Sequence, residues 1–173
     1  MTARPLRESR YPDRDRNVEG RAENSRPRDR LGRPLPRDAV DELAGRLVPA
    51  DVAGSVAEAL DHAVRLFDAQ RFFEAHEFFE WIWKSGMVAQ DDREFWKGVT
   101  QVAVGFTHAQ RGNASGAVTL LRRACRSMAP YPAQYQGIDA AALCAAARAV
   151  TAVVEVSPAS TDLAFPTFPR LQA

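Results

Sequence analysis

The sequence predicts an all-α protein, a compact bundle of about five to six helices built on antiparallel helical hairpins. Apolar residues recur every three to four positions over long stretches, and short breaks rich in Gly, Pro, Asn and Asp separate them. No Asn-Gly or Asp-Gly pair marks a β-hairpin, so no strands are expected. With 173 residues, 46% of them hydrophobic, the chain can bury one core, but two full-sized domains would be cramped.

Residues 1–37 differ from the rest of the chain in composition and charge. They contain 11 Arg and 6 Asp/Glu, a net charge of +5, whereas residues 38–173 contain 12 Lys/Arg and 16 Asp/Glu, a net charge of −4. A polar segment without periodicity buries too little apolar surface to offset its ordering entropy. We therefore expect a disordered basic arm over 1–37, able to contact nucleic acid or an acidic partner, and a single helical domain over 38–173.

Capping residues and prolines delimit the first two expected helices. Asp38 is placed to cap a short helix over 39–48, which Pro49 would end. Asp51 opens a second helix through about Ala69, whose apolar residues form one stripe.

The next two helices carry the most apolar residues. A third helix is expected over 72–84, with Gly86 as its stop, and a fourth over 91–110. The fourth is apolar nearly all round, which predicts a position at the centre of the bundle. Gly98 and Gly105 on this helix would allow close approach of a neighbouring helix or a ligand.

Two further helices and an extended tail complete the expected fold. A fifth helix is expected over 113–128 and a sixth, Ala-rich helix over 139–156, each beginning at a capping Asn or Asp. In the Pro-rich tail, Phe165 and Phe168 are expected to pack back on the body.

Composition also bears on location. No apolar run reaches 18 residues, so no membrane span is expected, and the N-terminus has no apolar stretch typical of a secretory signal. Cys125 and Cys144 form neither a metal pair nor a disulfide framework. A cytoplasmic location is expected.

The densest mixture of polar and aromatic residues is RFFEAHEFFEWIWK. On a helix, Phe72, His76, Phe79 and Trp83 share one face at spacings of 4, 3 and 4, and Glu80 lies one turn beyond His76. This geometry suits a His–Glu general base or a metal-ligand pair. It equally suits a core histidine satisfied by Glu80 or by a backbone carbonyl. The HExxE pattern lacks the second His of the HExxH zinc signature.

Polar residues also interrupt the apolar fourth helix. Gln101 and His108 are seven residues apart and lie on nearly the same face, with Arg111 at the helix end. Buried polar groups need partners, so these residues predict either a network that sets helix register or one side of a groove opposite His76 and Glu80.

Together these residues define a candidate ligand-binding groove. Its members are His76, Glu80, Trp83, Gln101, His108 and Arg111. No cofactor is predicted. A divalent metal on His76, Glu80 and His108 is the alternative, although the paired Glu-x-x-His motifs of di-metal carboxylate proteins are absent.

A basic stretch, LLRRACRS, lies on the expected fifth helix. Arg122 and Arg126 share a face there, which is typical of a solvated surface. Cys125 beside them is a candidate perturbed thiol without an evident base partner.

The segment FFEAHEFFEWIW, followed by REFWKGVTQVAVGFTHAQRGNASGAVTLLRRA, resembles the bacterial and archaeal domain-of-unknown-function family 309, from about Leu60 to Tyr131. The resemblance implies a small all-helical domain and supplies no reaction. Lys97 stands where the family more often has Gln. By position, the residues that match the family motif are Glu74, His76, Glu77, Glu80, Trp83, Gly98, Gln101, His108, Arg111, Gly112 and Asn113.

Two hypotheses of function follow. The first is a binding or scaffold module whose polar and aromatic groove around His76 and His108 takes a protein segment or a small molecule. The alternative is a small enzyme that uses a His/Glu site, with or without a metal, in the same groove. The helical-hairpin layout and the missing nucleophile favour the binding module.

Overall fold

The computed structural model describes residues 26–157 and 163–171. Within them the protein is an all-α bundle of six α-helices and a two-stranded sheet, which confirms the predicted fold class. The elements are α1 (Pro49–Val52), α2 (Val56–Asp68), α3 (Phe72–Lys84), the 3₁₀ turn η1 (Gln90–Asp92), α4 (Arg93–Gln110), α5 (Ala114–Met128), β1 (Gln134–Tyr135), β2 (Ile138–Asp139) and α6 (Ala140–Val156). None of the described helices is long and apolar enough to cross a bilayer.

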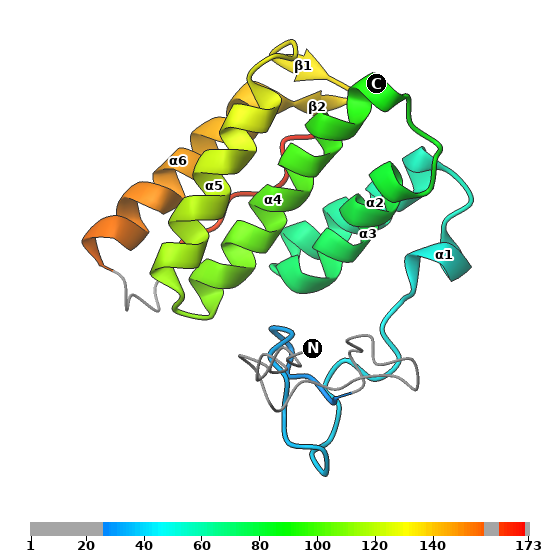
Figure 1. The fold of residues 1–173 in the computed structure, drawn as a ribbon, viewed down its shortest axis with the longest axis vertical. Coiled ribbons are helices and arrows are strands. Elements are labelled where there is room, and N and C mark those ends of the chain that lie inside the picture. Colours follow the sequence, from blue (N-terminus) through cyan, green and yellow to red (C-terminus); the bar gives the residue numbers. More distant parts are fainter. Residues whose placement is uncertain (1–25, 158–162, 172–173) are drawn as a thin grey trace, which may run out of the picture.

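Helices α2 to α6 pack in chain order. Each contacts the next one along the sequence, and Figure 1 shows α4, α5 and α6 side by side, with the α2–α3 pair beyond α4. Short connections force neighbouring helices to run antiparallel, as the sequence predicted. Asn113 and Asp139 cap α5 and α6 by accepting hydrogen bonds from Gly116 N (3.0 Å) and Ala142 N (2.8 Å), which confirms both predicted caps.

The predicted helix over 39–48 is wrong, because these residues form turns. The Asp41 carboxylate accepts hydrogen bonds from the backbone N–H groups of Arg28 and Leu43, both at 3.0 Å, and Gly45 has a φ of +78°. An Asp side chain that bonds nearby backbone in this way competes with helix formation. Pro49 begins α1 instead of ending a helix, since its missing N–H costs nothing at a first helical position.

The start of the second predicted helix also differs. Asp51 lies inside the short α1, and α2 begins five residues later at Val56. Its cap is Ser55, whose hydroxyl accepts a hydrogen bond from Glu58 N at 3.2 Å.

Helix α4 lies at the centre of the core, as predicted. Its Phe95, Val102 and Phe106 are fully buried. A Cβ atom added to Gly98 would lie 2.7 Å from Met128 Cγ, and one added to Gly105 would lie 2.6 Å from Leu121 Cδ2. Both glycines therefore serve the close packing of α4 on α5.

The chain after α6 returns beneath the bundle. Residues 163–171, red in Figure 1, run behind α4. The Phe165 ring lies 4.9 Å from Phe72 and 5.2 Å from Phe106, and the Phe168 ring lies 5.2 Å from Phe67. The prediction that both tail phenylalanines pack on the body is confirmed.

The small β-hairpin contradicts the prediction that the chain has no strands. Gln136 and Gly137, with φ values of 52° and 73°, form the two-residue turn between β1 and β2. Two successive residues with positive φ match the twist of a hairpin, and Gln stands here in the place where Asn or Asp is usual. The tail adds a bridge from Arg170 to Ile138, which helps to hold this short ladder.

Candidate functional site

Helices α3 and α4 present two facing rows of half-exposed side chains. The row on α3 contains Phe73, His76 and Trp83, and the row on α4 contains Lys97, Gln101, Val104, His108 and Arg111. Lys97 Nζ lies 5.3 Å from the centre of the Trp83 ring at one end, and the Arg111 guanidinium lies 5.6 Å from the Phe73 ring at the other. The two rows thus lie side by side, and we call the surface that they form the α3–α4 face.

Burial favours the neutral form of His76 on this face. Its Nδ1 hydrogen-bonds to the carbonyl of Phe73, one turn earlier, and its ring lies 4.9 Å from the Phe73 ring. Burial lowers the pKa of His76, and the positive charges of Arg111 and Arg28 act in the same direction, against the hydrogen bond to Phe73 and the charge of Glu80. Since Nδ1 donates to the carbonyl, Nε2 is the free acceptor of the ring.

The His108 ring is held by a residue at the start of α5, and its surroundings also favour the neutral form. The side-chain amide of Asn113 donates to His108 Nδ1 over 2.8 Å, so the ring carries its proton on Nε2. Burial lowers the pKa of His108, and Arg111 lowers it further. A Cβ atom on Gly116 would lie 2.6 Å from His108 Nδ1, so position 116 must be glycine for the His108 ring to fit.

Arg111 holds a distant part of the chain. Its Nε and Nη2 atoms both donate to the carbonyl of Leu31, at 2.9 and 2.5 Å. Next to Leu31, Gly32 has a φ of +76°, and a Cβ atom there would lie 2.2 Å from the Phe73 ring. The Arg28 guanidinium lies 5.6 Å from the same ring. Residues around the 28–32 turn therefore cover the Phe73–Arg111 end of the α3–α4 face.

This contact changes the predicted boundary of the arm. Residues 1–25 lie outside the described residues, but 26–37 follow a defined path and return on themselves, with Leu35 N bonded to Pro27 O at 2.8 Å. The prediction of one disordered segment up to residue 37 is therefore wrong for 26–37. The missed signal is Gly32 two residues before Pro34, since Gly and Pro close together are typical of a tight turn.

The other end of the face carries polar atoms without partners. Trp83 Nε1 and Gln101 Oε1 are buried and have no hydrogen-bond partner among the described residues. Three cations lie over the Trp83 ring at 5.3 to 5.9 Å, namely Lys84, Arg93 and Lys97.

Glu80 is directed away from the predicted groove. Its carboxylate pairs with Lys84 at 2.6 Å and lines a hollow of about 290 Å³ between α3 and residues 46–50. No hydrogen bond joins it to His76 within the described part of the chain. Nor do three His, Cys, Asp or Glu side chains there approach closely enough to hold a metal ion, so His76, Glu80 and His108 do not form the predicted metal set.

The pH dependence of stability should report on His76. Its pKa is below 6.5 in the fold, so unfolded chains bind the proton first as the pH falls below 6.5, and stability is lost in that range. The free energy of unfolding that is lost through His76 at pH 5.5 is at most about 1.4 kcal/mol, because this pH lies one unit below the ordinary pKa of histidine. Urea unfolding at pH 7.5 and 5.5 should show a smaller loss for His76→Gln than for the wild type. Equal losses would show that His76 titrates normally in the fold.

The fold and this face define a small helical domain with a polar and aromatic surface between two central helices. The family model described as Domain of unknown function (DUF309) matches residues 60–120, from α2 into α5. This match confirms the resemblance seen in the sequence, and the matched residues include the whole α3–α4 face. No curated protein matches the chain.

Proposed function

We propose that the protein is a binding module whose α3–α4 face holds an extended polypeptide segment. The observation that carries the proposal is the contact of Arg111 and Phe73 with Leu31 and Gly32. The two N–H groups of Arg111 bind a peptide carbonyl, which is a main-chain group present in any polypeptide. The Phe73 ring leaves no room for a Cβ atom and therefore selects glycine. The chain's own segment thus acts as an intramolecular ligand for one end of the face.

The remaining part of the face suits the continuation of such a ligand. A peptide unit offers one N–H and one C=O, and Gln101 Oε1 and Trp83 Nε1 are a buried acceptor and a buried donor without partners. The cations around Trp83 favour acidic side chains in the bound segment. The alternative, a His/Glu enzyme, has less support because Glu80 pairs with Lys84 and both histidines are held by structural hydrogen bonds.

A labelled peptide with the sequence of residues 26–43 tests the proposal by fluorescence anisotropy. In the wild type its binding should be weak, because the chain's own segment competes at a high effective concentration. Gly32→Ala displaces that segment and should tighten peptide binding about tenfold or more. Gly45→Ala is the matched control, because it shares the positive φ but has nothing within 4 Å of its added Cβ atom, so it should gain much less than Gly32→Ala.

Adding Arg111→Ala to Gly32→Ala should abolish the gain, since the carbonyl of the peptide loses both of its donors. If Gly32→Ala binds the peptide no better than the wild type, the face is not a peptide site.

A further inference from the structure

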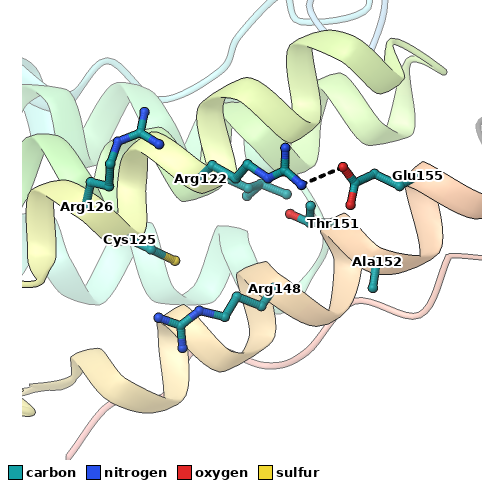
Figure 2. A pocket seen from close by; sticks show the side chains of 8 residues that line it. Arg122, Cys125, Arg126, Arg148, Thr151, Ala152 and Glu155 are labelled. Atoms are coloured by element: carbon teal, nitrogen blue, oxygen red, sulfur yellow. Dashed lines mark hydrogen bonds and ion pairs between the residues drawn. The ribbon is translucent and has the colours of Figure 1, made fainter.

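A second hollow lies between helices α5 and α6, away from the α3–α4 face. It has a volume of about 350 Å³ and is lined by Arg122, Cys125, Arg126, Arg148, Thr151 and Glu155, among others. Figure 2 shows the Cys125 side chain pointing from α5 into the gap, with Arg148 on the neighbouring α6. Nothing in the proposed function of the α3–α4 face uses this hollow.

The charge around the hollow is positive and largely unpaired. Arg122 is paired with Glu155 at 2.7 Å. Within the described part of the chain, no carboxylate pairs with Arg126 or Arg148, and both line the hollow together with Cys125. Two free guanidinium groups beside a concave surface attract small anions and raise their local concentration.

The second cysteine lies next to the first. Cys125 Sγ is 3.7 Å from the carbonyl oxygen of Cys144 on α6, and both thiols are free. Cys125 is half-buried at the hollow, whereas Cys144 is buried behind it. An anionic molecule that enters the hollow therefore meets the sulfur of Cys125 first.

The electrostatics favour the thiolate of Cys125. The neighbouring Cys144 side chain lowers the pKa of Cys125 to about 7, against the opposing effect of burial and with help from the charge of Arg148. The same interaction raises the pKa of Cys144. The thiolate is the form that attacks disulfides.

We propose that this hollow is a thiol–disulfide exchange site in which Cys125 attacks small disulfides that carry carboxylates, and Cys144 resolves the product. The Cys125 thiolate forms a bond to one sulfur of the small disulfide, whose S–S bond breaks and releases a thiolate that takes a proton from water. Cys144 then loses its proton to solvent and attacks the Cys125 sulfur, releasing the second small thiol. The small disulfide is reduced by two electrons, and the two cysteines are oxidised to a disulfide.

The test uses the full chain and two reagents, the dianionic 5,5′-dithiobis(2-nitrobenzoate) and the neutral 4,4′-dithiodipyridine. Arg148→Gln should slow the reaction of Cys125 with the dianionic reagent about threefold or more relative to the neutral one. Arg123→Gln is the matched control, because it removes the same charge from an exposed position of α5 outside the hollow. Cys125→Ser should remove the fast phase.

Mass spectrometry of the products tests the second step. The wild type should end with two hydrogens fewer and no bound nitrothiobenzoate, whereas Cys144→Ser should keep one such group on Cys125. If Cys144→Ser folds poorly, Cys144→Ala provides the same readout. Equal effects of Arg148→Gln and Arg123→Gln, or a wild type that ends with one group on each cysteine, would overturn the proposal.

Discussion

Replacing Phe106 with alanine should destabilise the protein by about 3–5 kcal/mol, the range for removing a fully buried aromatic side chain. Phe106 is fully buried in α4, and its ring lies 5.2 Å from Phe72, 5.2 Å from Phe165 and 5.6 Å from Phe67. Its removal leaves a cavity between α2, α3, α4 and the returning tail. Because four elements border this cavity, the shift of one of them alone would not fill it. Urea unfolding followed by circular dichroism measures the change.

Val104→Ala is the control on the same helix. Val104 is half-exposed on the α3–α4 face, so its truncation should cost less than about 1 kcal/mol. Similar unfolding midpoints for the Phe106 and Val104 variants would mean that the core does not centre on this side of α4.

Replacing Gly32 with alanine should release the 26–43 segment from the body without unfolding the helices. The added Cβ atom would lie 2.2 to 2.5 Å from three atoms of the Phe73 ring, which Arg28 and Arg111 flank at 5.6 Å. A clash with a held ring, added to the strain of a left-handed conformation, should weaken docking by about 2 kcal/mol or more. Trypsin should then cut after Arg28 and Arg30 about thirtyfold faster, because cleavage follows the population of the open state.

Gly45→Ala separates the two contributions. Gly45 has nearly the same positive φ, 78°, but nothing lies within 4 Å of an added Cβ atom. It should therefore show only the effect of backbone strain, about 1 kcal/mol. Equal trypsin rates for the two variants would show that contact with Phe73 does not hold the segment.

Local sequence determined the helices and the faces that they present. The period of apolar residues placed α4 at the centre of the bundle, and Asn113 and Asp139 marked the starts of α5 and α6. The spacing of Gln101 and His108 placed them in one row on α4. These features depend on residues within one or two turns of each other, so a single sequence contains the information.

Tertiary structure alone decided which distant groups meet. The 28–32 turn is ordered by Phe73 and Arg111, about 40 and 80 residues away, and no local pattern encodes that contact. In the same way, Asp41 formed turns instead of a helix because Arg28 N lies within its reach. Periodicity shows that a side chain needs a partner, but the partner is chosen by packing between elements far apart in the chain. For this reason the roles of Arg111, Gly32 and the Cys125–Cys144 pair became visible only in the folded protein.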